Sequence, residues 1–121
     1  MPSQDPLSEA IIGAAFRVSN TLGAGFVEKV YENALAHELA KAGFTALQQH
    51  AIQVTYDGIP VGEFIADLVV EGRIVIELKA VKALEDAHMA QCINYLKATA
   101  LHTCLLINFG RPHIEVRRVV L

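Results

Sequence analysis

The segment ADLVVEGRIVIELK, from Ala66 to Lys79, constrains the fold of this chain more than any other part of its sequence. Its valines, isoleucines and leucines predict two short core strands, yet Asp67, Glu77 and Lys79 lie among them. Side chains alternate between the two faces of a strand, so Glu77 and Lys79 share one face and the apolar residues beside them share the other. Ionised groups next to so much apolar surface are costly unless they are paired or hold a metal. The segment therefore indicates either a binding site or a Glu-Lys pair on a half-exposed strand.

The composition of the chain predicts one globular domain and argues against some classes of protein. Its 121 residues are 53% hydrophobic and 19% charged, which fits a single domain over residues 1–121 with residues 1–6 as a loose tail. The net charge of −3 argues against a protein that coats nucleic acid through charge alone. Contact with nucleic acid then needs a local basic patch or a bound cation, and part of the apolar excess could cover a homo-oligomer interface.

The cysteines and the apolar runs bear on the location of the protein. Cys92 and Cys104 are far apart in the sequence and lack the spacing of a metal site, and no signal peptide is evident. A reducing, cytoplasmic environment is therefore expected. The longest apolar runs, such as AIIGAAF, are too short to cross a membrane, so no membrane partner is expected.

The spacing of apolar residues predicts an α/β fold with a mixed sheet flanked by helices. The first three strands read as an antiparallel meander. The third strand, the following helix and the strand HTCLLINF are expected to form a crossover unit, which should be right-handed if its strands lie parallel in one sheet. The last strand is expected at a sheet edge. The expected elements are helices over residues 7–22 and 26–42, strands over 48–56, 61–70 and 73–80, a helix over 84–99, and strands over 102–109 and 114–120.

Two helical motifs add polar residues to this picture. Gln91 and Tyr95 are one helical turn apart and lie on the same face of their helix. Taken alone, they describe a polar helix face with one amphipathic tyrosine. The residues from Gly25 to Tyr31 read GxxExxY at the start of the second helix. Glu28 in that motif is explained equally well as a carboxylate that the helix dipole stabilises.

Five segments in order resemble the GxxExxY protein family, a small branch of the PD-(D/E)xK nuclease superfamily that is close to its RecB-like nucleases. The segments are GAGFVEKVYENALAHEL, YDGIPVGEFIADLVV, IVIELKAV, AQCINYLKAT and LLINFG. The resemblance extends from about Ile12 to Leu121. It implies the αβββαβ nuclease core, here with an extra N-terminal helix and a C-terminal edge strand.

The resemblance also implies an active site. Asp67 matches the metal-binding aspartate of the second strand, and Glu77 and Lys79 match the acidic and basic positions of the ExK motif. Glu28 matches the acidic residue of the helix before the sheet, and Gln91 matches the glutamine of the QxxxY helix. The catalytic set that the family implies therefore combines three charged strand residues with one residue from each of two helices.

The implied residues suit the hydrolysis of a phosphodiester. Asp67 and Glu77 offer the hard oxygen ligands that Mg²⁺ or Mn²⁺ prefers. The backbone carbonyl of Leu78, several waters and, directly or through water, Glu28 would complete the metal shell. Lys79 would position or deprotonate the attacking water, or stabilise the charge that develops on the phosphate.

The helix with the QxxxY motif would complete the site. Gln91 would orient a phosphate or the metal-bound waters, while Tyr95 would either pack beneath Gln91 or bind substrate by stacking on a base. His88 and His50 are weaker candidates for lining the same cleft. The candidate phosphate-binding cations, which scattered surface charges explain equally well, are Arg111, Arg117, Arg118, Lys82 and Lys97.

These observations favour a Mg²⁺- or Mn²⁺-dependent nuclease, with a nucleic acid, DNA ahead of RNA, as its partner. The alternative is a catalytically inactive module on the same fold, which binds nucleic acid or a protein. The negative net charge favours that alternative, and the intact Asp/Glu/Lys/Gln set opposes it. A metal-dependent hydrolase of a smaller phosphate ester also fits the small size of the domain.

The spacing of the two carboxylates predicts the loop between their strands. Directly paired residues of an antiparallel hairpin share a face. A two-residue Glu71-Gly72 turn would pair Asp67 with Ile76 and send Glu77 to the opposite face. A three-residue loop pairs Asp67 with Glu77 instead, and Gly72 supplies the positive φ that such a loop needs. We therefore expect an odd-length loop or a bulge at this point.

Overall fold

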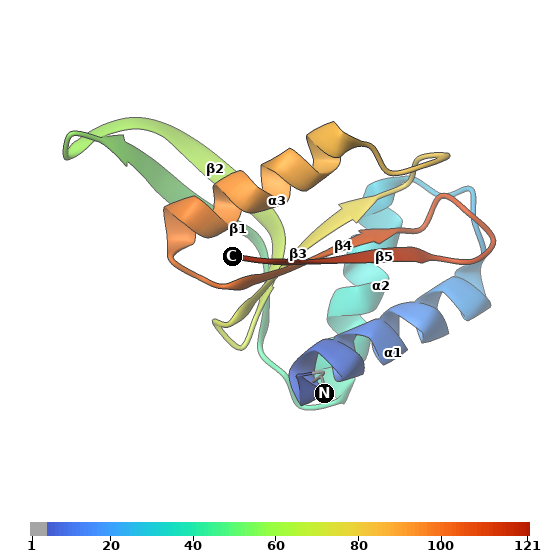
Figure 1. Cartoon of the computed structure of the whole chain (residues 1–121). Helices are drawn as coiled ribbons and strands as arrows, with labels where there is room; N and C mark the ends of the chain where they lie inside the picture. Colours follow the sequence, from blue (N-terminus) through green and yellow to red (C-terminus); the bar gives the residue numbers. More distant parts are fainter. Residues whose placement is uncertain (1–4) are drawn as a thin grey trace.

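A five-stranded sheet forms the centre of the molecule, and three helices cover its two faces (Figure 1), within the residues that the computed structural model describes, 5–121. The elements are α1 (Pro6–Leu22), α2 (Glu28–Lys41), β1 (Ala46–Tyr56), β2 (Ile59–Val70), β3 (Ile74–Lys79), α3 (Asp86–Thr99), β4 (Thr103–Asn108) and β5 (Glu115–Val120). Helices α1 and α2 pack on one face of the sheet, and α3 packs on the other.

The topology of the sheet confirms the predicted fold class. The strand order is β1-β2-β3-β4-β5, which makes β1 and β5 the edges. Strands β1, β2 and β3 form an antiparallel meander. Strands β3 and β4 are parallel and are connected through α3, while β5 pairs antiparallel with β4. The mixed sheet, the crossover through a helix and the edge position of the last strand were predicted from the sequence.

Each face of the sheet has its own apolar cluster. The larger cluster lies under α1 and α2 and includes Ile11 and Leu35, and the smaller one lies under α3 and includes Tyr95. Strand β4 contributes to both, because Leu105 points to the first cluster and Leu106 to the second. This double burial explains the continuous apolar run of β4. None of the described helices is long and apolar enough to cross a membrane.

The hairpin between β2 and β3 has the three-residue loop that the spacing predicted. Val70 pairs with Ile74, so three residues separate the strands, and Gly72 in the loop has a φ of 63°. The same register, continued along the strands, places Asp67 across from Glu77. The prediction of an odd-length loop is confirmed, and the two carboxylates can meet.

The helix starts differ from the prediction by one or two residues. Helix α2 begins at Glu28 rather than at residue 26. The backbone N–H of Phe26 donates to the Tyr31 hydroxyl at 3.2 Å, and this bond holds the preceding segment outside the helix. Helix α1 begins at Pro6, and Asp5 is its N-cap residue, so these two residues do not belong to a loose tail. Residues 1–4 of the expected tail lie outside the described part of the chain.

The β1–β2 hairpin bends in its middle, and its outer half, residues 50–66, leaves the sheet as a two-stranded arm (Figure 1). Ala66 packs in the cluster under α3, whereas Leu68 packs in the cluster under α1 and α2. Residues two apart in a regular strand share a face, so the alternation breaks at Asp67. Gln49, which lies opposite on β1, has a φ of 52°. The bend therefore coincides with the aspartate that the sequence singled out.

Candidate active site

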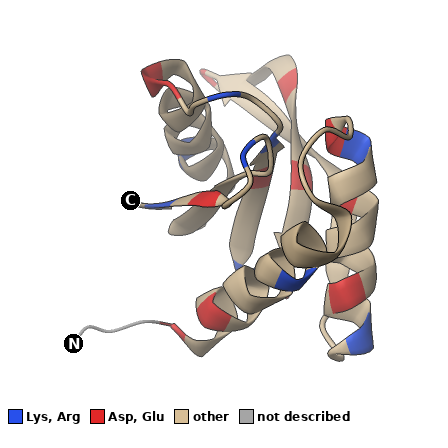
Figure 2. Cartoon of the chain, turned by 90° about the vertical axis from the view of Figure 1, so that its right-hand side faces the viewer, with Lys and Arg blue, Asp and Glu red and all other residues tan. Residues whose placement is uncertain are grey.

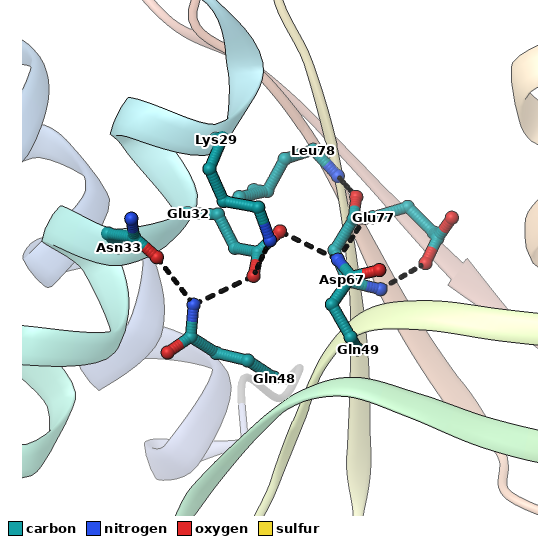
Figure 3. A network of polar contacts seen from close by, with 8 residues as sticks. All are labelled: Lys29, Glu32, Asn33, Gln48, Gln49, Asp67, Glu77 and Leu78. Carbon is teal, nitrogen blue, oxygen red and sulfur yellow. Dashed lines mark hydrogen bonds and ion pairs between the residues drawn. The ribbon is translucent and has the colours of Figure 1, made fainter.

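Asp67 and Glu77 meet where β2 and β3 stop pairing (Figure 3). The last backbone pair of these strands is Leu68 with Ile76. Beyond this pair, side chains replace the backbone ladder. The Leu78 N–H donates to Asp67 Oδ2 at 2.7 Å, and the Asp67 N–H donates to Glu77 Oε2 at 3.1 Å. Each carboxylate is therefore oriented by a backbone amide of the opposite strand.

Burial changes the titration of both carboxylates. Glu77 is only 7% exposed, and this burial, followed by the negative charge of Asp67, raises the pKa of Glu77 to about 7. The pKa of Asp67 is also raised, chiefly by burial, although the Leu78 N–H opposes the shift. Two like charges in a poorly solvated place repel each other unless a proton or a cation joins them. The pair therefore suits a positively charged ligand.

Lys79 completes the charged set on β3. It shares a strand face with Glu77, and its positive charge opposes part of the rise in the pKa of Asp67 and of Glu77. Its backbone carbonyl accepts the Phe109 N–H at 2.8 Å, so the chain after β4 fixes the end of β3. The structure thus brings together the three charged residues that the sequence singled out.

A carboxylate of α2 joins this pair through a glutamine, and the sequence reasoning missed it (Figure 3). Glu32 is 4% exposed and accepts the side-chain amides of Gln48 at 2.7 Å and of Gln49 at 2.8 Å. The Gln49 amide also lies 3.4 Å from Asp67 Oδ1. Lys29 donates to Glu32 at 3.0 Å. Glu32 therefore reaches Asp67 through one amide group, and its charge contributes to the raised pKa of Asp67.

Glu28, the acidic residue expected on α2, lies one turn before Glu32. It is exposed at the first position of the helix, and its charge makes a minor contribution to the raised pKa of Glu77. It faces the same region without a hydrogen bond to the carboxylate pair among the described residues. The i,i+4 spacing of Glu28 and Glu32 is the sequence signal that could have identified Glu32.

The tyrosine of the GxxExxY motif has a structural role. Tyr31 is fully buried, and its ring stacks on Phe109 with 4.6 Å between the ring centroids. Its hydroxyl donates to the Gly23 carbonyl at 2.6 Å and accepts the Phe26 N–H at 3.2 Å. One hydroxyl therefore ties the Gly-Ala-Gly loop to α2 and fixes the helix start that carries Glu28.

The two residues of the QxxxY motif on α3 differ in their exposure to solvent. Gln91 is exposed, whereas Tyr95 is fully buried, with its ring 5.1 Å from the ring of Phe64 and its hydroxyl donating to the His50 carbonyl at 3.4 Å. A ring without exposed surface cannot stack on a base. The expected stacking of Tyr95 on a base is therefore wrong, and its ring packs against Phe64 instead.

The weaker candidates have structural or scattered positions. His88 caps α3, because its Nδ1 accepts the Glu85 N–H at 3.0 Å, and this cap places the helix start at Asp86, two residues later than predicted. Figure 2 shows Lys and Arg spread over helices, loops and the last strand, with acidic residues between them. Arg117, for example, pairs with Glu115 at 3.6 Å. The basic residues are therefore dispersed rather than gathered in one patch.

Asn108 is a second buried polar residue that the sequence reasoning missed. It is fully buried beside Lys79 in the β3–β4 pair. Its side-chain oxygen accepts the N–H groups of Val81 and Gly110, both at 3.0 Å, and its amide donates to the Val81 carbonyl and to Glu115, both at 2.9 Å. These bonds satisfy the whole amide group. A Cβ at Gly110 would overlap the Val81 backbone, so the two chain segments that follow β3 and β4 are in direct contact.

The donor set at Asp67 and Glu77 fits a hard divalent cation. Protein-bound Mg²⁺ is commonly held by one or two carboxylates and keeps several waters. Asp67 and Glu77 supply two carboxylates whose orientation is already fixed. Within residues 5–121, no group of three or more His, Cys, Asp and Glu side chains gathers that could hold a metal ion. The geometry therefore fits a water-rich site rather than an all-protein cage.

Comparisons with known proteins identify the family of this chain. The model of the PD-(D/E)XK nuclease superfamily matches residues 5–119. The crystal structure of SSO0001 is similar with a TM-score of 0.63 and 19% identity, over 77% of this chain and 50% of that chain, so this chain spans half of its length. An alkaline exonuclease from Laribacter hongkongensis aligns with a TM-score of 0.46 and 11% identity, over 99% of this chain and 72% of that chain. No curated protein matches the sequence. By its match over residues 5–119, the chain belongs to the PD-(D/E)XK nuclease superfamily.

Proposed function

We propose that this protein is a metal-dependent nuclease that hydrolyses phosphodiester bonds of DNA or RNA. The observation that carries the proposal is the buried pair of Asp67 and Glu77, each bonded to a backbone amide of the opposite strand and both close to Lys79. A buried carboxylate with a pKa near neutrality, beside a like charge and a lysine, is typical of a functional site. Membership of the superfamily supports the same conclusion.

The residues of the site would have different roles in hydrolysis. Asp67 and Glu77 would hold Mg²⁺ or Mn²⁺, with the Leu78 carbonyl and, through water, Glu28 as further ligands. When bound, such an ion activates water and neutralises charge on a phosphate. Lys79 Nζ would hold the attacking water or donate to a phosphate oxygen as negative charge develops there.

The finer assignments rest on the sequence motifs. Gly25, Glu28 and Tyr31 support the GxxExxY branch of the superfamily, and exposed Gln91 on α3 would orient a phosphate or the metal-bound waters. DNA is the substrate that we test first. Both cysteines are free and buried, which is compatible with the reducing environment of a cytoplasm.

A protein-binding module is the second candidate, and the arm favours it. The arm exposes Tyr56 at 71%, Ile59 at 62% and Val61 at 60%. It carries no Lys or Arg, since the sequence has none between Lys41 and Arg73. Exposed apolar side chains without cations suit a protein surface, such as a second copy of this chain, better than a phosphate backbone.

A cleavage assay with the purified chain decides between the two candidates. Single- and double-stranded DNA and RNA would be incubated with Mg²⁺, with Mn²⁺ and with EDTA. We expect metal-dependent cleavage, and we expect Lys79→Ala to reduce it by about 10²- to 10⁴-fold while the circular dichroism spectrum stays unchanged. Lys41→Ala, which removes an exposed lysine on the opposite face of the sheet, should cleave like the wild type. Equal activity in the wild type and Lys79→Ala would reject the nuclease.

A further inference from the structure

A cleft of about 500 Å³ lies between the arm and α3, and the site described above does not use it. The arm and the C-terminal half of α3 both contribute lining residues, and Figure 1 shows how these two elements are arranged. Its lining residues are Gln53, Val54, Thr55, Phe64, Asn94, Lys97 and Ala98.

Three lining residues of the cleft lie on α3, the helix that also carries Gln91. Gln91, Asn94 and Ala98 follow an i, i+3, i+7 spacing, which places them on one face of the helix. Lys97 is six residues after Gln91, or about 9 Å along the helix axis at 1.5 Å per residue. Phe64 in the cleft wall contacts Tyr95, the residue that anchors α3 to the base of the arm. A strand of nucleic acid that binds Gln91 and follows this face of α3 would therefore reach the cleft.

The lining of the cleft has the chemistry of a nucleotide site. Gln53, Thr55 and Asn94 supply both donors and acceptors to the lining, counting the backbone of β1 as well as side chains, and such groups read the edge of a base. The half-buried ring of Phe64 offers apolar surface beside them. Lys97 is the one charged residue of the lining, it is exposed, and no carboxylate lies among the lining residues to neutralise it. Its charge suits a phosphate.

We propose that this cleft binds an unpaired nucleotide next to the scissile phosphate, with its base against the arm and its phosphate on Lys97. The proposal rests on the proposed nuclease function and adds that the substrate is single-stranded where it crosses α3. A base that pairs with a second strand hides the edge that Gln53 and Asn94 would read.

Binding measurements without metal test the cleft separately from catalysis. The probe is a fluorescein-labelled twelve-residue oligothymidylate, titrated with protein in EDTA and followed by fluorescence anisotropy. We expect Lys97→Gln and Asn94→Ala to weaken binding by roughly 3- to 10-fold each, and Lys97→Gln to lower the salt dependence by about one phosphate contact. Lys41→Gln removes the same charge from α2 and should change the affinity less than twofold.

Each of the following results would overturn the proposal. The first is equal affinity of the wild type, Lys97→Gln and Asn94→Ala, or no binding at all by the wild type. The second is a duplex of the same length that binds as tightly and responds to the same variants. Amide NMR shifts on addition of thymidine 5′-monophosphate should be confined to residues near 53–55 and 94–98, and shifts elsewhere alone would also reject the cleft. If Lys79 proves essential for cleavage while Lys97→Gln and Asn94→Ala bind normally, the proposed nuclease function is supported and the proposed nucleotide site in the cleft is rejected.

Discussion

The two halves of the β2–β3 pair differ in what holds them together. In the closed half, residues 68–70 pair with residues 74–76 through the backbone, and all six are buried and apolar. In the open half, the Asp67 and Glu77 carboxylates take the place of the backbone ladder. The same two strands therefore contain a stable scaffold and, one residue further on, a pair of buried charges that weakens the fold unless a proton or cation is bound.

The closed half should govern stability. Ile76 is fully buried in the cluster under α1 and α2, and Ile76→Ala should lower the free energy of unfolding by about 2–5 kcal/mol, because it leaves a cavity in a packed core. Ile65 provides a matched control, since it lies in the arm and is 48% exposed. Ile65→Ala should cost less than about 1 kcal/mol. Urea unfolding measures both, and equal losses would break the distinction between core and arm.

The open half should make stability depend on pH. Folding raises the pKa of Glu77 from 4.5 to about 7, so the folded state binds a proton more tightly than the unfolded state. The free energy of unfolding without metal should therefore fall as the pH rises from about 4.5 to about 7, by up to about 3 kcal/mol. The raised pKa of Asp67 acts in the same direction.

Glu77→Gln removes this titration and checks its origin. Urea unfolding in EDTA at about pH 5 and about pH 8 should give a smaller difference for the variant than for the wild type, and the variant should be the more stable protein at the higher pH. A wild type that becomes more stable across this range would contradict the assignment of the burial penalty to Glu77.

The open half should bind a divalent cation, because the cation relieves the repulsion between Asp67 and Glu77. Calorimetry with Mn²⁺ should show binding to the wild type, and Asp67→Asn and Glu77→Gln should each weaken it by about a hundredfold. Gln48→Ala, which alters the α2 network without removing either ligand, should bind within about tenfold of the wild type. Unchanged affinity in both carboxylate variants would place the metal elsewhere.

The smallest expected effect is on Mn²⁺ affinity, and it should distinguish the two acidic residues of α2, Glu28 and Glu32. Glu32 is buried and reaches Asp67 through Gln49, whereas Glu28 is exposed. Glu32→Gln should therefore change the Mn²⁺ affinity by about tenfold, and Glu28→Gln by about threefold or less. The opposite order would make Glu28 the residue that supports the site directly.

Much of the fold follows from local patterns in the sequence. The change of period fixes the order of helices and strands, and counting from Asp67 to Glu77 fixes the length of the loop between their strands. These predictions succeed because alternation along a strand is a rigid geometric rule. The starts of α2 and α3 were misplaced by two residues, because side-chain hydrogen bonds of Tyr31 and of the Glu85–His88 capping box decide them.

The site could be predicted only where its residues are close in sequence. Asp67, Glu77 and Lys79 lie on neighbouring strands, so their meeting follows from one hairpin and one strand. Glu32 enters the site because α2 packs across β1 and because the backbone at Gln49 turns its side chain toward both carboxylates. That contact depends on the packing of a distant helix, which no local pattern specifies.

The contact between Gly110 and Val81 determines which sequences can occupy this fold. Any side chain at position 110 must push away the backbone that follows Lys79, so a library randomised there and selected for folded protein should return glycine almost alone. Gly62, on the arm, has open space where a Cβ would stand, with no neighbouring atom within 4 Å. A second library, randomised at position 62 and selected in the same way, should therefore return many different residues. A glycine directly after Asn108 and Phe109 is thus a steric requirement of the backbone that follows Lys79, and it can serve as a diagnostic position when distant sequences are sorted.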